Sequence, residues 1–199
     1  TYYNYKSSLT QLKETRTKLL LYSKNYSNAL EREDLLEITI SSIVNIILIL
    51  LIGICSHHFY ESIAFLICFV PLRQFTGGYH ANTYFKCNFL FSILYIALLI
   101  AYDLTIKQLT YHADALMLVF SIVTFASECP IEHNNKPLSD IQKKRNKNLS
   151  VILGLFYGSI GVISQVLSYD VGVIFLYTLV LISLLVIVAT FQKIRREVF

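Results

Sequence analysis

The chain is dominated by long apolar runs that alternate with short polar stretches. A membrane-spanning helix needs about 20 mostly apolar residues, and four of the runs reach that length. These four runs are residues 38–56, 87–106, 149–169 and 171–191. Two shorter runs, 59–72 and 113–129, fit a short span, a re-entrant segment or a buried helix. The pattern predicts an all-α membrane protein.

The placement of basic residues distinguishes between these alternatives. If all six runs cross the bilayer from a cytoplasmic N-terminus, sixteen of the 17 Lys and Arg residues face the cytoplasm and only Lys107 lies outside. If the run 59–72 does not cross, seven basic residues lie inside and ten outside. Cytoplasmic loops of membrane proteins carry an excess of Lys and Arg. The sequence therefore predicts six transmembrane helices in the cell membrane, with both termini cytoplasmic.

Composition agrees with this class. Hydrophobic residues make up 55% of the chain and charged residues 15%, against about 25% charged residues in soluble domains. These values exclude a disordered chain, a secreted disulfide scaffold and an ordinary cytosolic enzyme. The net charge of +4 follows from the basic cytoplasmic loops, so it is no argument for a nucleic-acid partner.

The apolar pattern also predicts three regions. Residues 1–37 carry Leu9, Leu12 and Leu19 at helical spacing among Lys, Arg and Thr. They are expected to form a cytoplasmic amphipathic segment, either docked at the membrane interface or solvated before the first span. Residues 38–191 form the six-span membrane domain, and residues 192–199 form a basic cytoplasmic tail.

The connection between the second and third runs, residues 71–88, is unusual for a loop. Pro71 and the Gly77–Gly78 pair are expected to break helices. The aromatic and aliphatic residues between them are too apolar for a hydrated linker. The segment is therefore predicted to be a re-entrant or interfacial loop at the cytoplasmic boundary. It concentrates polar chemistry there, in Arg73, Gln74, His80, Asn82 and Cys87.

Two of these residues have the chemistry of a cysteine peptidase. Cys87 begins the third span, where the positive end of a helix favours the thiolate. His80 is the natural general base for such a thiol. On one straight helix the two side chains would lie about 10 Å apart along the axis, so a helix starting near Asn82 is predicted, with His80 folded back. The alternative is that both residues are structural.

Two segments of the chain resemble those of a known family. The string from Arg73 through Gly77, Gly78 and His80, followed by Cys87, is similar to that of the accessory gene regulator B (AgrB) family, as is the stretch 130–137. The resemblance implies a membrane endopeptidase of Gram-positive quorum sensing. It would cut a short amphipathic, AgrD-like propeptide near its C-terminal part and yield a cyclic thiolactone or lactone peptide, without a cofactor.

The resemblance also implies roles for individual residues. Cys87 would be the nucleophile and His80 the base, whereas Arg73, Gly77 and Gly78 match surrounding positions whose roles are less defined. The chemistry adds candidates. The backbone amides at Gly77–Gly78 and the side chains of Gln74 and Asn88 are candidate oxyanion donors.

Residues near the fourth span are supporting candidates. Glu128 or Glu132 would orient His80 as the third member of a triad, and Lys136 lies in the stretch that resembles the family. The simpler interpretation is interfacial anchoring. The neighbouring Cys and His residues show no recognised zinc-ligand spacing, so no metal is expected.

Three further features have more than one interpretation. The basic run 143–147 is a topology anchor or a docking site for an acidic precursor tail. A stripe of Gly154, Gly158 and Gly161 packs helices within one chain or forms a homodimer interface. Asn45, in the first span, is expected to form an interhelical hydrogen bond, and a catalytic role is the alternative. The alternative function is a small-peptide transporter or channel-like protein with a re-entrant gate, which the apolar mid-span positions disfavour.

Overall fold

The computed structural model describes residues 39–77, 84–106, 111–131 and 139–198, which form six helices and no β-strand. The first helix is Thr39–Cys55. The others are α2 Phe59–Thr76, α3 Tyr84–Thr105, α4 Tyr111–Glu128, α5 Asp140–Val166 and α6 Asp170–Val198. The predicted all-α class is confirmed. The predicted N-terminal amphipathic segment, 1–37, lies outside the described residues.

Contacts divide the chain into two units, residues 1–44 and 45–199. In the first unit the structure describes only residues 39–44, which are helical. Every other described residue belongs to the second unit.

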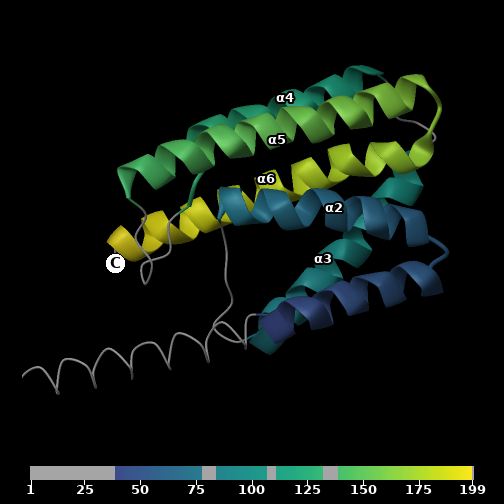
Figure 1. Ribbon diagram of the computed structural model, residues 1–199, viewed down its shortest axis with the longest axis horizontal. Helices are drawn as coiled ribbons and strands as arrows, with labels where there is room; N and C mark the ends of the chain where they lie inside the picture. Colours follow the sequence, from purple (N-terminus) through teal and green to yellow (C-terminus); the bar gives the residue numbers. More distant parts are fainter. Residues whose placement is uncertain (1–38, 78–83, 107–110, 132–138, 199) are drawn as a thin grey trace, which may run out of the picture. The chain divides into compact units, whose positions relative to one another are not determined.

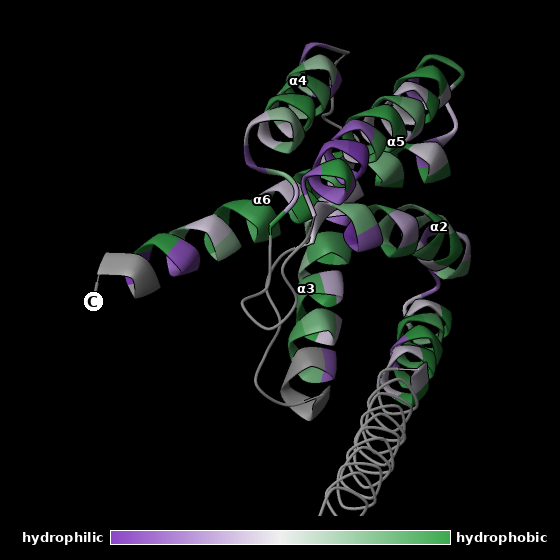
Figure 2. Ribbon diagram, turned by 60° about the vertical axis from the view of Figure 1, so that its left-hand side comes forward, coloured by the Kyte–Doolittle hydropathy of each residue, from purple (hydrophilic) through white to green (hydrophobic). Residues whose placement is uncertain are grey.

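Each predicted apolar run coincides with one helix. Within the described part of the chain, three segments are long and apolar enough to cross a membrane, namely Asn88–Thr105, Asp140–Val166 and Asp170–Arg195. The helix Thr39–Cys55 is apolar but shorter. Figure 2 shows hydrophobic residues along the length of these helices, with hydrophilic residues gathered towards helix ends. The count of six spans stays a prediction.

The prediction that Pro71 ends the second helix is wrong. Pro71 lies inside α2, which continues to Thr76. A proline has no N–H, so the carbonyl of Ile67, four residues earlier, loses its helical partner. The Tyr157 hydroxyl of α5 donates a hydrogen bond of 2.9 Å to this carbonyl. A side chain from another helix thus supplies the donor that Pro71 lacks, and the helix survives.

The predicted loop 71–88 is shorter than expected at both ends. Its first residues belong to α2, and residues 84–88 belong to α3. Residues 78–83 lie outside the described residues, so a re-entrant or interfacial segment there stays a prediction.

The helix α5 begins nine residues before its apolar run, at Asp140 rather than Leu149. Ser139 caps it: its hydroxyl accepts from the Gln142 amide, and the Gln142 side chain accepts from the Ser139 amide. This reciprocal capping box satisfies N–H groups that the first turn leaves without helical partners. The basic run therefore lies on a helix.

The core is built by α4, α5 and α6, which run side by side, with α2 against α5 and α6 (Figure 1). The glycine stripe of α5 allows this close packing. A methyl group on Gly154 would lie 2.9 Å from Ile122 of α4, and one on Gly161 would lie 2.7 Å from Leu176 of α6. The stripe is therefore buried within one chain, as small residues at helix interfaces commonly are.

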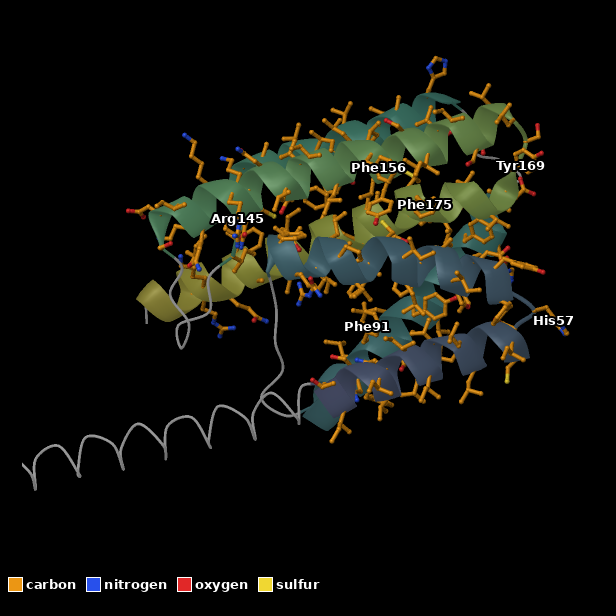
Figure 3. The ribbon with its side chains drawn as sticks, in the orientation of Figure 1. His57, Phe91, Arg145, Phe156, Tyr169 and Phe175 are labelled. Atoms are coloured by element: carbon orange, nitrogen blue, oxygen red, sulfur yellow. The ribbon has the colours of Figure 1, made fainter. Side chains whose placement is uncertain are left out.

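The contact between α2 and α3 is aromatic. Phe65 and Phe69 of α2 pack against Phe91 and Tyr95 of α3, with ring centroids 4.5–5.8 Å apart. Phe91 is labelled where these two helices meet in Figure 3. The Tyr95 hydroxyl also shares a buried hydrogen bond of 2.6 Å with the Ser62 hydroxyl. This bond gives the apolar contact a fixed register.

Candidate active site

The candidate site is at the end of the bundle where α2 and α4 end and α5 begins. These ends lie on the same side in Figure 1, and Arg145 marks that side in Figure 3, opposite to His57 and Tyr169. The described basic side chains of α5 and the last turns of α6 belong to this end, because α5 starts and α6 finishes there. Basic residues that are distant in the sequence thus gather at one end of the bundle, as the predicted excess of Lys and Arg on one side of the membrane requires.

The backbone at the end of α2 has a conformation that favours glycine. Gly77 has φ 69° and ψ −149°, in the left-handed half of the backbone map. A methyl group on Gly77 would lie 2.4 Å from the carbonyl oxygen of Ile131. Both the backbone conformation and the lack of space therefore require glycine at this position.

A parallel bridge joins this end of α2 to the chain that follows α4. Gly77 pairs with Ile131, and the Ile131 amide donates to the Thr76 carbonyl at 3.0 Å. The Arg73 guanidinium and the Thr76 hydroxyl both donate to the Gly77 carbonyl. These donors satisfy carbonyls that the last turn of a helix leaves without partners. The backbone at the end of α2 is thus fixed as far as Gly77.

Charged groups from three helices act on Cys129, which lies two residues before Ile131 of this bridge. Glu128 is the last residue of α4, and Cys129, which follows it, is 5% exposed. The sulfur of Cys129 lies within electrostatic range of Glu128, of Arg73 from α2 and of Lys147 from α5. The predicted supporting residue Glu128 and the predicted motif residue Arg73 are therefore brought to the same region.

Cys87 is the fourth residue of α3 as described, and its side chain lies outside the described residues. A cysteine in the first turn of an apolar helix is near the positive end of the helix dipole. Asn88, the next residue, is described. Its Oδ1 accepts a hydrogen bond of 2.9 Å from Asn45 Nδ2 of the first helix. The interhelical hydrogen bond predicted for Asn45 is confirmed, and its partner is the residue after Cys87.

The other predicted site residues divide into two groups. Gln74 is exposed near the end of α2. Gly78, His80, Glu132 and Lys136 lie outside the described residues, as does the predicted helix start near Asn82. The geometry of His80 relative to Cys87 therefore stays a prediction.

Two contacts were not expected from the sequence. The pairing of Gly77 with Ile131 is made by the backbone, so no side-chain signal marks it. The choice of Asn88 as the partner of Asn45 was also not expected, although an isolated amide in an apolar span was itself a signal. Among the described residues, no group of three or more His, Cys, Asp or Glu side chains is placed to hold a metal ion.

The basic run has a defined local structure. Lys143 pairs with Asp140 at 4.0 Å, whereas Lys144, Arg145 and Lys147 are exposed. The run therefore presents positive charge on one helix at the end of the bundle that carries the candidate site. Both interpretations, membrane anchoring and docking of an acidic segment, need such exposure.

An open apolar groove of about 420 Å³ lies beside Pro71 of α2. Its lining residues are Ile46, Leu66, Ile67, Val70, Pro71 and Tyr157. The Tyr157 hydroxyl already donates to Ile67. This lining could contact an apolar chain, but it supplies no nucleophile and no free hydrogen-bond donor for cleavage of a peptide bond. The candidate site is therefore the polar region at the helix ends.

Known proteins resemble this chain over most of its length. The family model for accessory gene regulator B matches residues 22–192. Relatives named for their likeness to that family include AgrB-like protein 2 of Clostridium perfringens (strain 13 / Type A), 28% identical over 74% of this chain and 73% of the relative. AgrB-like protein 1 of the same strain is 28% identical over 80% and 82%. No solved structure matches the chain.

Proposed function

The chain belongs to the accessory gene regulator B family, and from that premise we propose that it is a membrane cysteine endopeptidase of agr quorum sensing. Its substrate is a short amphipathic, AgrD-like propeptide, cleaved near its C-terminal part. Its product is a cyclic thiolactone or lactone peptide. The family and the apolar helices indicate a membrane protein of the agr system. The peptidase chemistry is the proposal.

The proposed reaction has two steps. His80 takes the proton of the Cys87 thiol, and the thiolate attacks the scissile carbonyl. The carbon–nitrogen bond breaks, the proton passes to the leaving amine, and the N-terminal fragment remains on Cys87 as a thioester. A thiol within that fragment then loses its proton to His80 and attacks the thioester carbonyl. The bond to the Cys87 sulfur breaks, the ring closes, and the proton on His80 returns to the Cys87 thiolate. Exchange of one thioester for another keeps the bond energy, provided that water is excluded.

The observation that carries the proposal is the fixed exit of the chain from α2. Gly77 leaves helical geometry and is held by Arg73 and by the bridge to Ile131. The helix α2 therefore stops before His80. This stop leaves His80 in the connection between α2 and α3, and Cys87 is in the first turn of α3 as described. The proposal further requires that His80 and Cys87 do not share one straight helix, on which they would lie about 10 Å apart.

The same end of the bundle supports the proposed topology. Arg73 is in the last turn of α2, and the exposed basic residues of α5 and α6 belong to the start of α5 and the end of α6, which lie at this end. An excess of basic residues is typical of the cytoplasmic side. We place the site at the cytoplasmic interface of a six-span protein with both termini inside. Residues 1–37 form the interfacial segment, 38–191 the membrane domain and 192–199 the tail.

Cleavage of the propeptide by purified protein in liposomes tests this function. Cys87→Ala is expected to abolish release of the C-terminal fragment, measured by mass spectrometry, and Cys87→Ser to slow it or trap the acyl-enzyme. The matched control is Cys55→Ala, because Cys55 is an exposed thiol outside the site. Full cleavage by Cys87→Ala would remove the proposed mechanism.

Thiol labelling gives an independent test. Cys68 and Cys129 are buried, so in a Cys55→Ala background a maleimide is expected to report mainly on Cys87. Labelling should be fast and should slow when the propeptide is bound. A rate equal to that of the buried thiols would contradict an activated nucleophile at Cys87.

A further inference from the structure

One buried side chain of α5 has an acceptor without a partner. Asn146, in the second turn of the helix, is 9% exposed. Its Oδ1 atom is buried and has no hydrogen-bond partner among the residues that the structure describes. The other buried polar residues of α5 and α6 differ from it, because the hydroxyls of Ser150, Thr178 and Ser183 each donate to the backbone carbonyl four residues earlier. Proteins leave few buried polar atoms unpaired, because each one costs free energy.

The packing of α5 places Asn146 at the end of the bundle that carries the candidate site. Buried residues follow one another at four-residue spacing from Asn146 to Gly154 and Gly158. Methyl groups on Gly158 and Gly154 would meet Leu118 and Phe125 of α4, respectively, so this face of α5 packs against α4 and the two helices are antiparallel. Asn146 lies about 12 Å along the axis from Gly154. It is therefore at the level of the segment that follows the end of α4.

The electrostatics at this end agree with that placement. Lys147, the residue after Asn146, lies within electrostatic range of the Cys129 sulfur, and so do Arg73 and Glu128. Cys129 directly follows α4 and precedes the backbone bridge to α2. Asn146 thus belongs to the same end of the bundle as the groups that form the candidate site.

The chemistry of the Oδ1 atom restricts the class of its partner. The exposed basic residues that flank it on α5, Lys144, Arg145 and Lys147, attract anions (Figure 3). A carboxylate or a phosphate diester offers only acceptors, so it cannot bind an amide oxygen. An extended peptide offers a main-chain N–H at almost every residue, and its acidic side chains offer carboxylates to the basic residues. A peptide therefore satisfies both features, whereas a lipid phosphate satisfies only the second.

We propose that Asn146 is a substrate-recognition residue for the main chain of the propeptide. Its Oδ1 atom accepts a hydrogen bond from one N–H of an extended segment, and the flanking basic residues bind acidic side chains of the same segment. This inference rests on the proposed function, because it takes the propeptide as the ligand. The hydrogen bond forms when the peptide binds and persists through the reaction, so its loss weakens binding and leaves the chemical step unchanged.

The alternative is that Asn146 serves only the fold. The two roles predict opposite changes in stability for Asn146→Leu, which keeps a similar volume and removes the polar atoms. A residue that stabilises the fold lowers the melting temperature when it is replaced. A residue kept for a ligand raises the melting temperature, because an unpaired buried acceptor is removed. The matched control is Asn148→Leu, since Asn148 is an exposed amide on the opposite side of the same helix.

The experiment measures binding of a synthetic AgrD-like propeptide, with a fluorophore at its N-terminus, to full-length protein in phosphatidylcholine nanodiscs. All proteins carry Cys87→Ala, so that cleavage does not compete with binding. Asn146→Leu is expected to raise the Kd about 3- to 10-fold, as for loss of one hydrogen bond. It is expected to raise the melting temperature by roughly 2–4 °C. Asn148→Leu is expected to leave the Kd within about twofold.

A set of propeptides, each N-methylated at one main-chain amide, identifies the donor. N-methylation removes one N–H. At one position it is expected to weaken binding about 3- to 10-fold when Asn146 is present and less than about twofold in Asn146→Leu, because both changes remove the same hydrogen bond. If Asn146→Leu does not fold, Asn146→Ala takes its place in this comparison.

Two results would overturn the inference. One is an unchanged Kd in Asn146→Leu, which together with a lower melting temperature would assign Asn146 to the fold. The other is a set of N-methylated propeptides in which no effect depends on Asn146. Both results leave the proposed function standing, because that function is tested by cleavage. Cleavage of the propeptide by the Cys87→Ala protein would contradict the proposed function and not the role of Asn146 in binding.

Discussion

Replacing Gly77 by alanine tests whether the end of α2 must keep its observed geometry. The backbone of Gly77, with φ 69° and ψ −149°, is close to a region that is essentially restricted to glycine. The added methyl group would lie 2.4 Å from the Ile131 carbonyl oxygen, whereas ordinary contact begins at 3.4 Å. The two backbones must therefore separate by about 1 Å. That shift breaks the hydrogen bond of 3.0 Å from Ile131 to Thr76.

The cost follows from these two changes. Strained backbone costs about 1–3 kcal/mol, and the lost hydrogen bond costs about 0.5–1.5 kcal/mol. The free energy of unfolding should therefore fall by roughly 2–4 kcal/mol. For a chain of this size, 1 kcal/mol corresponds to about 2–4 °C, so the melting temperature should fall by roughly 5–15 °C. Cleavage should fall by about 100-fold, because a displacement near 1 Å is enough for such a loss.

Far-ultraviolet circular dichroism measures the melting temperature, since the chain contains no Trp for fluorescence. Mass spectrometry of the released fragment measures cleavage. The control is Gly154→Ala in the packing of α5 against α4, where the methyl group would meet the Ile122 side chain at 2.9 Å and the ring of the buried Phe125 at 3.0 Å. This control should lower the melting temperature, because the packing must adjust, but it should keep wild-type cleavage. If Gly77→Ala behaved like Gly154→Ala in both assays, the reasoning about the end of α2 would be refuted.

Three other predictions address the fold and the basic run. Tyr157→Phe should lower the free energy of unfolding by about 1–3 kcal/mol, because it leaves the Ile67 carbonyl without a donor. In a Pro71→Ala background the loss should be smaller, because the alanine N–H can donate to that carbonyl. Equal losses in both backgrounds would contradict the explanation. Asp114→Asn should raise the melting temperature by roughly 2–4 °C at neutral pH, because both carboxylate oxygens of Asp114 are buried without a partner. The gain should decrease in acid, where the carboxyl is neutral. A lower melting temperature of the variant at neutral pH would contradict this prediction. Charge reversal of the basic residues in 143–147 should raise the KM for the propeptide without altering insertion, and unchanged processing would argue for membrane anchoring alone.

The interfaces of α5 resolve one of the open alternatives for this chain. Gly158 would meet Leu118 of α4 at 2.2 Å if it carried a methyl group, so the glycine stripe is used for packing inside the protein. A homodimer, if it forms, needs another surface. Exposed apolar residues occur on every described helix, as expected for helices that face lipid.

The helical architecture could be predicted from the sequence because length and apolarity are local properties. Each apolar run predicted a helix, and a helix was found at each. Helix ends were harder to predict, because they depend on partners far away in the chain. Pro71 remains helical because Tyr157 of another helix donates to Ile67, and α5 starts early because Ser139 and Gln142 cap it.

The sequence alone determined the class of protein, the helices and the family. It also identified Cys87, His80 and Arg73 as candidate site residues. Tertiary structure decided which distant residues meet: Ile131 against Gly77, and Asn45 against Asn88. The physical reason is that hydrophobic periodicity records the preference of each segment for lipid or water. A hydrogen bond between two segments depends on how their helices pack, and neither segment records that by itself.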